Sequence, residues 1–483
     1  MRNERALLAE IEKAEKRLTE TFRQKLEVNT DLDRTLVSYQ ANRSENGHRW
    51  YKYKEGFSAE LMRYLFDAAG LTKGLILDPF VGSGTALFGA SERGIDAVGI
   101  ELLPSSSEVV EVRALLSQMA ADSTAARLRE FAKSHAWTTK GPAAPFPHVR
   151  ITEGAFSAEN ETKLGRYLHE VDKLRDPDLK RVLRFAAMSV LEAISFTRKD
   201  GQYLRWDFRS GRTLGRKRFD KGTIAGFDRA VTDKINEIAA DLSPADFLRQ
   251  LYAPQHGRIT LLSGSCLDLI PTLGDRSFDA IVTSPPYCNR YDYTRTYALE
   301  LAFLGTSEAG FRHLRQEMLS CTVENRDKED IERRIGCSAY RKGIAAFENQ
   351  SLLQAILEYL DYCRESDLLN NNGIVRMVRN YFREMAVVLA ALAAKLKPSG
   401  LFYMVNDNVR YQGIQVPVDL MLSDIAENVG LSVETIWVLP RGKGNSSQQM
   451  GVHGREELRK CVYVWRSKAK SATRSNRELA RAA

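Results

Sequence analysis

The sequence has few cysteines and histidines, and these residues form no pattern typical of a metal site or a disulfide framework. Its 483 residues include six cysteines and seven histidines, without a CxxC pair or an HExxH motif. Scattered single thiols are typical of reduced cysteines in a cytoplasmic protein. The sequence therefore predicts a cytoplasmic protein without a bound metal.

Long apolar runs are missing as well. No stretch of about 18 apolar residues occurs, so the sequence predicts no transmembrane helix. The N-terminal residues, MRNERALLAEIEKAEKRL, are rich in charge and lack the apolar centre of a signal peptide. We therefore expect no association with a membrane.

Positive charge is in surplus, with a net charge of +8. A basic balance suits a polyanionic partner, although many basic proteins bind no nucleic acid. The distribution is more informative, because the segment 198–221 holds nine Lys or Arg against three Asp. Aromatic residues lie among these charges, a mixture that suits contact with phosphates and bases. A solvated basic loop with its aromatics in the core is the alternative.

Seven short apolar runs, separated by helical patterns, are typical of buried strands. They are residues 75–80, 97–102, 259–265, 279–286, 401–407, 433–439 and 460–465. Strands that alternate with helices predict a doubly wound, mostly parallel α/β sheet. The last two runs are close enough in sequence to pair as a hairpin-like edge.

Other regions fall outside this alternation. Residues 4–28 predict one amphipathic helix, which either packs on the protein's own core or serves as a dimer contact or a DNA-side arm. Residues 105–255 and 305–372 are helical in pattern and predict insertions, which commonly carry substrate recognition on α/β sheets. The basic tail, residues 467–483, predicts disorder.

A glycine turn, Asp78-Pro-Phe-Val-Gly-Ser-Gly-Thr85, follows the first run and opens a helix. Glycines let the backbone adopt positive φ and approach a ligand closely, and a helix N-terminus favours a polar or anionic group. Alone this signal is weak, because tight strand–helix turns also use glycine for packing. Glu101 at the end of the next run strengthens it, because a carboxylate there can accept both ribose hydroxyls of a nucleoside.

The third strand end, which includes Ser265, Cys266 and Asp268, is expected beside these two and could meet an adenine ring. The turn could in principle hold NAD. However, it lacks the spacing of the GxGxxG fingerprint and offers little for a pyrophosphate. A nucleoside attached to an amino acid fits better.

Together, DPFVGSGT, GIEL and TSPPY resemble the amino-directed DNA methyltransferases, which form N4-methylcytosine or N6-methyladenine. The resemblance implies a seven-stranded, Rossmann-like methyltransferase sheet with a large, mainly helical insertion, and S-adenosyl-L-methionine as cofactor. The resemblance also implies that the glycine turn binds the methionine part of the cofactor and that Glu101 binds its ribose. The cofactor residues so implied are Phe57, Ser58, Asp78, Phe80, Gly82, Gly84, Thr85, Glu101, Ser265, Cys266 and Asp268. Phe57 and Ser58 belong to a segment that resembles the family's KPxxL but lacks its proline. In the third strand the family usually has Gly-Asp, and this chain has Gly264-Ser265 at that position. We therefore expect Asp268 to take the place of the family's aspartate.

The tetrapeptide Ser284-Pro285-Pro286-Tyr287 supplies the expected chemistry. An exocyclic amine is a poor nucleophile because its lone pair is delocalised into the ring. The Ser284 hydroxyl and the Pro285 carbonyl can bind the amino hydrogens, and the prolines make the loop rigid. Tyr287 offers a face on which a flipped base can stack. A structural proline turn is the alternative.

Serine at the first position of the tetrapeptide is found mostly in cytosine-N4 enzymes of the family, so we favour N4-cytosine over N6-adenine. No Pro-Cys dipeptide occurs, so C5 methylation through a covalent cysteine has no candidate nucleophile. We expect Cys288 to serve in packing.

The expected organisation combines a methyltransferase domain with recognition elements. Its parts are an N-terminal helical arm (1–49), a cofactor-binding half (50–104), a helical insertion for target recognition (105–255), a catalytic half (256–466) with a second insertion (305–372), and the tail (467–483). The residues expected to contact nucleic acid are Arg198, Lys199, Arg205, Trp206, Arg209, Arg212, Arg290 and Arg295.

The function predicted is a site-specific methyltransferase acting on double-stranded DNA, as a monomer or a homodimer, with a separate restriction or defence protein as a candidate partner. An RNA or protein amide N-methyltransferase and a non-catalytic DNA-binding module with this fold are the alternatives.

Overall fold

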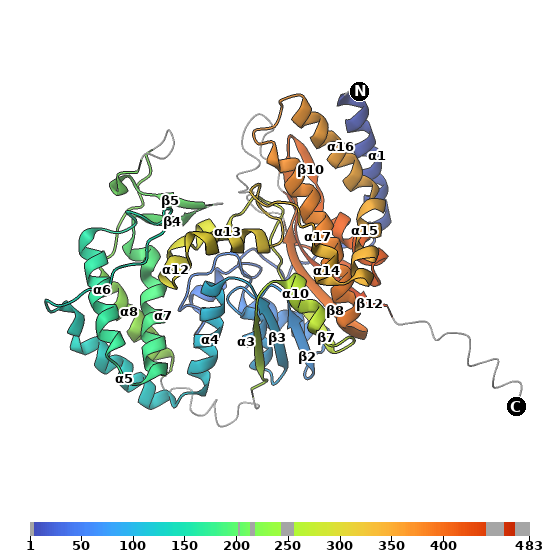
Figure 1. Cartoon of the computed structure of the whole chain (residues 1–483). Coiled ribbons are helices and arrows are strands. Elements are labelled where there is room, and N and C mark those ends of the chain that lie inside the picture. Colours follow the sequence, from blue (N-terminus) through green and yellow to red (C-terminus); the bar gives the residue numbers. More distant parts are fainter. Residues whose placement is uncertain (1–3, 201–202, 213–217, 243–255, 441–457, 469–483) are drawn as a thin grey trace, which may run out of the picture.

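The computed structural model describes residues 4–200, 203–212, 218–242, 256–440 and 458–468 (Figure 1). Parts of the basic segment 198–221 lie outside these ranges. Residues 469–483 lie outside them too, so the disorder expected for the tail stays a prediction.

A large, mostly parallel sheet forms the centre of the molecule. Its strands are β1 (Leu26–Val28), β2 (Leu75–Asp78), β3 (Asp96–Glu101), β6 (Ile259–Ser263), β7 (Phe278–Thr283), β8 (Leu396–Asp407), β11 (Leu431–Val438) and β12 (Lys460–Ser467). They lie in the order β1-β11-β12-β8-β7-β2-β3-β6, and β12 runs antiparallel to both of its neighbours. The described part of this sheet therefore has eight strands instead of the predicted seven. The sequence missed β1, because three residues are too short to show an apolar alternation.

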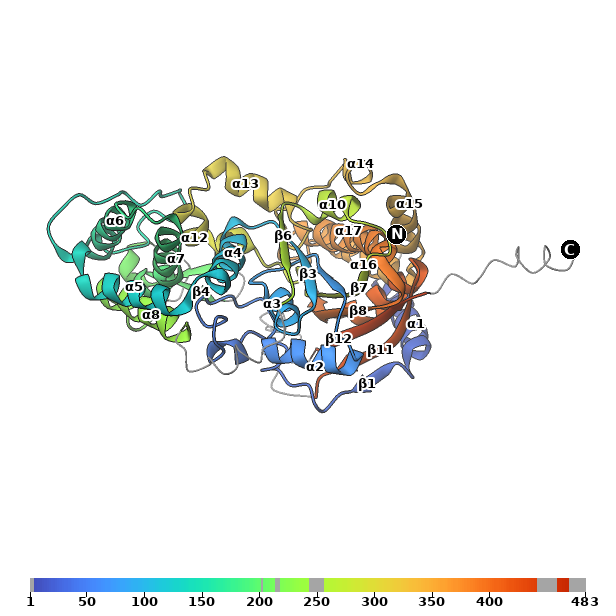
Figure 2. The same cartoon turned by 90° about the horizontal axis from the view of Figure 1, so that it is seen from below.

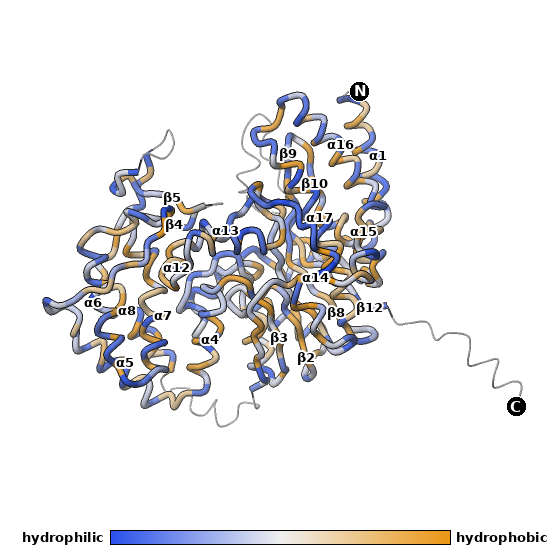
Figure 3. The backbone as a smooth tube through the Cα atoms, in the orientation of Figure 1, coloured by the Kyte–Doolittle hydropathy of each residue, from blue (hydrophilic) through white to orange (hydrophobic). Residues whose placement is uncertain are grey.

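Helices cover both faces of the sheet, because successive residues of a strand point to opposite sides. In β8, Phe402 and Met404 join the apolar cluster of one face, while Tyr403 and Val405 join that of the other. On the first face lie α1 (Glu4–Phe22), α15 (Cys337–Asn349), α16 (Ser351–Glu365), α17 (Gly373–Lys395) and α18 (Val418–Asn428); on the second lie α2 (Ala59–Ala69) and α3 (Thr85–Ser91). Figure 2 shows these layers on opposite sides of the sheet. In Figure 3, where the backbone is coloured by the hydropathy of each residue, β2 and β3 contain apolar residues.

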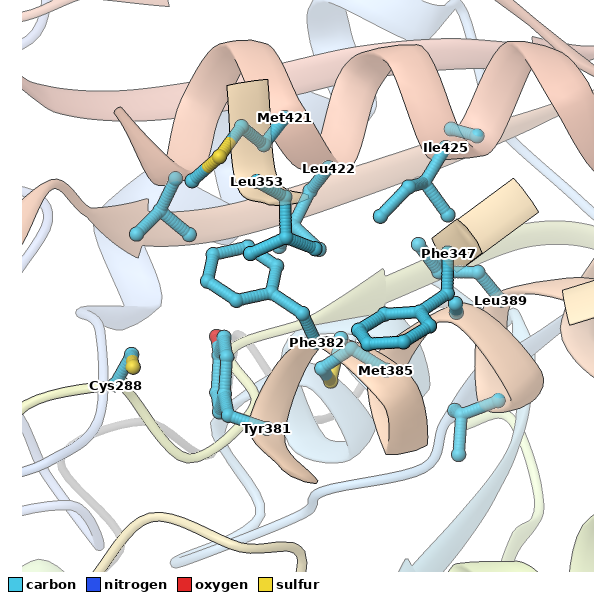
Figure 4. Packing of buried hydrophobic residues seen from close by; sticks show 14 of the residues in the cluster. Cys288, Phe347, Leu353, Tyr381, Phe382, Met385, Leu389, Met421, Leu422 and Ile425 are labelled. Atoms are coloured by element: carbon cyan, nitrogen blue, oxygen red, sulfur yellow. The ribbon is translucent and has the colours of Figure 1, made fainter. Parts of the chain in front are cut away.

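Helix α17 is the centre of the first layer. Phe382, Met385 and Leu389 of α17 are fully buried and pack beside Leu353 of α16 and Leu422 of α18 (Figure 4). Full burial of each such side chain is worth about 1.5–3 kcal/mol. This packing fixes α17 between its neighbouring helices on this face of the sheet.

The N-terminal helix ends earlier than expected. It stops at Phe22, and Leu26 already pairs with Ile436 of β11. Leu7, Ile11 and Phe22 are buried, and α1 packs against α16 and α18. The helix is therefore packed on the protein's own core, and β1 covers the edge that β11 and β12 were expected to form.

A separate helical body follows β3 and has its own apolar cluster (Figure 1, left). Its elements are α4 (Pro104–Gln118), α5 (Ala121–Ser134), α6 (Ala158–Asp172), α7 (Pro177–Ile194), α8 (Phe227–Asp241) and the hairpin of β4 (Thr197–Asp200) and β5 (Tyr203–Trp206). Helix α12 (Ala298–Phe303), from the second half of the chain, packs into the same cluster. The body is thereby joined to the part of the chain after residue 256, predicted to be the catalytic half, and lies beside the carboxyl edge of β3.

The remaining elements are short connections. They are α10 (Cys266–Leu269), α11 (Tyr293–Thr296), α13 (Glu308–Glu317), α14 (Ile331–Ile335), β9 (Val409–Tyr411), β10 (Ile414–Val416) and the 3-10 turns at Ala41–Arg43, Ala136–Thr138, Phe208–Ser210 and Ile270–Thr272. Within the described ranges, no helix combines the length and apolar character needed to cross a membrane.

Candidate active site

One cavity opens where β7, β2, β3 and β6 end side by side. These four strands are consecutive in the sheet and parallel, so the loops that follow them meet at one edge. Crevices at this edge are the usual ligand sites of α/β sheets. The cavity encloses about 760 Å³ of empty space, counting its mouth.

The glycine turn after β2 forms one wall of the cavity. Gly82 lines it and has φ 55°, and a Cβ there would lie 2.6 Å from the ring of Tyr53. Gly84 has φ 82°, and its Cβ would meet Phe88 and Val110 at 2.9 Å. Gly84 does not line the cavity and serves the packing of the turn. Both glycines are thus required by conformation and by space.

Glu101 closes the turn from the neighbouring strand. Its Oε2 accepts the Gly82 N–H at 2.7 Å, and its Oε1 accepts the Leu103 N–H at 2.7 Å. Burial raises the pKa of this carboxyl to about 7, although both hydrogen bonds oppose the shift. Each oxygen keeps a lone pair, and the residue lines the cavity. Glu101 can therefore accept a pair of ligand hydroxyls.

Asp78 lies behind the wall. It is 1% exposed, and its Oδ1 accepts the Phe80 N–H at 3.0 Å and the Thr283 hydroxyl at 2.7 Å. Burial raises the pKa of this carboxyl to about 7. Asp78 does not line the cavity. It fixes the glycine turn to the strand that precedes the tetrapeptide.

Thr85 supplies an unused polar group. Its residue is 4% exposed and lines the cavity, and its hydroxyl has no hydrogen-bond partner among the described residues. A buried hydroxyl without a partner costs free energy, because it has lost its bonds to water. A ligand with a polar group beside the turn would satisfy it.

The tetrapeptide continues from β7. The Ser284 hydroxyl lies 3.1 Å from the Tyr287 hydroxyl and 3.2 Å from the Val405 carbonyl oxygen, and can donate to one of them at a time. Ser284 and Pro286 line the cavity, whereas Pro285 and Tyr287 do not. Burial raises the pKa of the half-buried Tyr287 well above its usual value, so its hydroxyl stays protonated.

The remaining cofactor residues predicted from the sequence divide into two groups. Phe57, Phe80, Ser265 and Cys266 line the cavity. Burial raises the pKa of the Cys266 thiol to about 12, so this side chain is uncharged at neutral pH.

Ser58 and Asp268 do not reach the cavity. The Ser58 hydroxyl caps α2 by accepting the Leu61 N–H at 3.1 Å, and it donates to the Leu36 carbonyl at 2.5 Å. Asp268 forms a two-pronged ion pair with Arg334, with distances of 2.8 and 2.7 Å. Both side chains already have structural partners, so neither expected cofactor contact is present in this geometry.

The cavity also has walls that sequence reasoning missed. They are Tyr53, Glu55, Glu317, Met318 and Leu319, together with neighbours of the predicted residues. Tyr53 and Glu55 precede Phe57 by a few positions, and of these three lining residues the motif pointed only to Phe57. Glu317 to Leu319 lie at the end of α13, and no motif points to them.

The basic residues expected to bind nucleic acid are mostly engaged within the protein. Lys199 is 2% exposed and pairs with Glu300 at 2.5 Å, between the rings of Tyr51 and Tyr297. Arg198, next to it, is exposed. The alternation of the β4 strand therefore buries one of these two cations and exposes the other.

The arginines of the hairpin region pack on aromatic rings or bind nearby acceptors. Arg205 lies over Phe219, and Arg212 lies over the buried Trp206 and donates to three backbone carbonyls. Arg209 is paired with Asp207, whose pKa it holds far below the usual range.

Two further arginines follow the tetrapeptide. Arg290 donates to Asn370 at 3.5 Å, and Arg295 pairs with Glu324 and Asp292. Arg212 of the helical body and Arg295 of the catalytic half line one shallow cavity together with Arg150 and Arg315. Arginines from both halves thus converge where the helical body meets the catalytic half.

Among the described residues, no group of three or more His, Cys, Asp or Glu side chains is arranged to hold a metal ion.

The chain is similar to known DNA methyltransferases. A family described as DNA methylase matches residues 2–111. The type II methyltransferase M.AvaI, found in Nostoc and in Anabaena variabilis, is 47% identical over 466 residues, which cover 95% of both chains. The type II methyltransferase M.BsoBI of Geobacillus stearothermophilus is 38% identical over 454 residues, which cover 90% of this chain and 88% of that protein.

Proposed function

The chain belongs to the type II DNA methyltransferases of the N4/N6 DNA methylase family, and from that premise we propose that it moves a methyl group from S-adenosyl-L-methionine to the exocyclic amino group of a flipped base in double-stranded DNA. The observation that carries this proposal is that the glycine turn and the tetrapeptide both contribute residues to the lining of one cavity. The glycine turn and the tetrapeptide end neighbouring strands, and Thr283 is bonded to Asp78 between them.

The cavity suits the proposed cofactor in several ways. The Glu101 carboxylate can accept the ribose hydroxyls, and Ser265 and Cys266, just after the next strand β6, line the side proposed for the adenine ring. The unpartnered Thr85 hydroxyl and the close backbone at Gly82 leave room and polarity for the methionine part. When bound, the cofactor supplies an activated methyl group on a sulfonium centre.

The chain's own residues position the base. The Ser284 hydroxyl and the Pro285 carbonyl can bind the amino hydrogens and draw the nitrogen towards tetrahedral geometry. Pro285 and Pro286 restrict the loop, so that the nitrogen is held in line with the methyl group. Tyr287, which accepts a bond from Ser284 in one of that hydroxyl's two arrangements, offers a face for the extruded base.

We favour cytosine N4 as the target atom over adenine N6. The support is Ser284, since serine at this position is found mostly in cytosine-N4 members of the family, where adenine enzymes mostly carry Asp or Asn.

For DNA binding, the arginines between the helical body and the catalytic half and the exposed Arg198 are the proposed phosphate contacts. A separate restriction partner, the oligomeric state and a cytoplasmic location stay predictions.

Transfer of a tritiated methyl group to duplex DNA, RNA and protein, measured side by side, tests the proposal. We expect label in duplex DNA, a loss of roughly a hundredfold or more in Ser284→Ala, and a smaller loss in Tyr287→Ala. Label in RNA or protein alone would support the alternative enzyme classes. Cofactor binding without any labelled product would support a non-catalytic DNA-binding module.

A further inference from the structure

Glu55 is a carboxylate in the wall of the cavity, and the sequence motifs assign it no role. It lies in the loop before α2 and lines the cavity together with Tyr53, Gly56 and Phe57. Burial raises the pKa of this carboxyl above its usual value, and the hydrogen bonds it accepts oppose the shift. Such a group costs free energy unless a partner compensates it.

Two tyrosines hold Glu55 in one orientation. The Tyr291 hydroxyl donates to its Oε1 and the Tyr297 hydroxyl donates to its Oε2. The Lys54 N–H donates to the Tyr297 hydroxyl at 3.3 Å, which leaves that hydroxyl's hydrogen for the carboxylate. Tyr291 and Tyr297 are 8% and 0% exposed, so both tyrosines are shielded from water, while Glu55 itself is half-buried. A carboxylate fixed at both oxygens still has lone pairs for a cation.

The position of Glu55 along the cavity identifies which part of a ligand it meets. The sheet order places the tetrapeptide, the glycine turn, Glu101 and Ser265 in sequence along the edge. The loop of Glu55 lies at the glycine turn, because a Cβ at Gly56 would be 3.9 Å from the Ser83 hydroxyl. The tyrosines that hold it follow the tetrapeptide in the chain. Glu55 is therefore at the end opposite Ser265, where the amino-acid part of the cofactor would lie.

The charge of the cavity points the same way. Its described walls include Glu55, Glu101 and Glu317, and no Lys, Arg or His. Glu317 is paired with Arg334, and Glu101 is held by two backbone N–H groups. Glu55 accepts its hydrogen bonds from neutral hydroxyls, and Lys54 and Lys199 act on its carboxyl only as nearby charges that lower its pKa. Among the three wall carboxylates it is therefore the one best suited to a ligand cation near the glycine turn.

We propose that Glu55, oriented by Tyr291 and Tyr297, binds the α-ammonium group of S-adenosyl-L-methionine. This assignment rests on the proposed cofactor. It gives the segment before α2 a second task besides covering the cavity: through the two tyrosines, a bound cofactor is linked to the loop that carries the tetrapeptide.

Calorimetric binding of two ligands tests this role. The ligands are S-adenosyl-L-homocysteine and its analogue without the α-amino group. We expect the wild type to prefer the amino ligand by roughly tenfold to a hundredfold, as for a hydrogen bond between charged groups. In Glu55→Gln the preference should fall to about fivefold, as expected for a typical neutral hydrogen bond, with little change for the deamino ligand.

Matched variants complete the test. Glu60→Gln, an exposed change in the first turn of α2, should keep the wild-type preference. Tyr297→Phe keeps the ring that stacks on Tyr53 at 5.3 Å and removes the hydroxyl, which donates to Glu55 and accepts the Lys54 N–H. The preference should therefore shrink partly, even if Glu55→Gln fails to fold. Equal weakening of both ligands in Glu55→Gln, or an unchanged preference in both variants, would overturn the assignment. A wild type that binds neither ligand would overturn the proposed cofactor instead.

Discussion

The Thr283 hydroxyl donates a 2.7 Å hydrogen bond to Asp78 Oδ1, and both side chains are buried. Thr283 is the residue before the tetrapeptide, and Asp78 opens the glycine turn. The bond therefore sets the distance between the part proposed to hold the cofactor and the part proposed to hold the base. Asp78 acts here as a positioning residue, because it does not line the cavity itself.

Removal of this bond should weaken both stability and catalysis. We expect Thr283→Val to lower the free energy of unfolding by about 1–3 kcal/mol, since Asp78 loses one of its two partners in a buried place. The turnover number should fall more than the affinity for the cofactor, because the two parts lose their alignment. Urea unfolding and steady-state kinetics measure these effects. Thr260→Val, at an exposed position of β6, is the control, and equal effects in both variants would argue against a specific bond.

Substitution of Gly82 tests the close approach of the turn. Gly82→Ala meets two costs, a φ of 55° and a Cβ 2.6 Å from the Tyr53 ring. Gly70→Ala is a matched control, because Gly70 has φ 61° and no atom within 4 Å of its Cβ. We expect the control to cost about 1–2 kcal/mol of stability, as the left-handed conformation alone does. Gly82→Ala should cost more and should also reduce cofactor affinity, measured by calorimetry. Cofactor affinity equal to the wild type in Gly82→Ala would contradict the proposed role of the turn.

The buried carboxyl of Glu101 should make stability depend on pH. Its pKa is raised to about 7 in the folded protein, so between pH 5 and 7 the folded state binds a proton that the unfolded chain has released. The stabilisation from this group is complete below its unfolded pKa and is lost as the pH rises through 7.

Comparison of Glu101→Gln with the wild type isolates this term. The free energy of unfolding of the variant, relative to the wild type, should rise between pH 5 and 7.5, by about 1.4 kcal/mol for each unit of pKa shift. Glu60→Gln, an exposed change, serves as the reference. A difference between Glu101→Gln and wild type that does not change with pH would show that the carboxyl is not perturbed by burial.

Substitution of the adjacent cations Arg198 and Lys199 should distinguish an effect on DNA binding from an effect on stability. Lys199→Ala leaves Glu300 buried without its partner and should cost about 3–5 kcal/mol of stability. Arg198→Ala should change stability by less than about 0.5 kcal/mol. It should weaken binding to all DNA sequences and reduce the slope of affinity against salt by about one unit. Fluorescence anisotropy at several salt concentrations measures this slope, and an unchanged slope would remove Arg198 from the DNA surface.

The sequence predicted most strands of the sheet, because buried strands are continuous apolar runs. The glycine turn, Glu101 and Ser284 lie at one edge of the sheet as expected, because the loops after parallel strands meet there, and the roles of these residues stay predictions. The prediction failed where a side chain's partner comes from a distant segment. Asp268 was assigned to the cofactor, but Arg334, 66 positions away, holds it outside the cavity. Lys199 was assigned to DNA, although Glu300 makes it part of the core. Composition could show that the segment 198–221 is basic, but only the fold decides which of its charges face outward.

The most direct test of the account is the identity of the methylated nucleoside. Duplex DNA would be incubated with the full chain and S-adenosyl-L-methionine that carries a deuterated methyl group, then digested to nucleosides and analysed by mass spectrometry. We predict labelled N4-methylcytosine in the wild-type reaction and its loss in Ser284→Ala. Labelled N6-methyladenine would overturn the base preference that rests on Ser284. Label in 5-methylcytosine alone, or in no nucleoside, would contradict the central claim that this site methylates an exocyclic amino group of DNA.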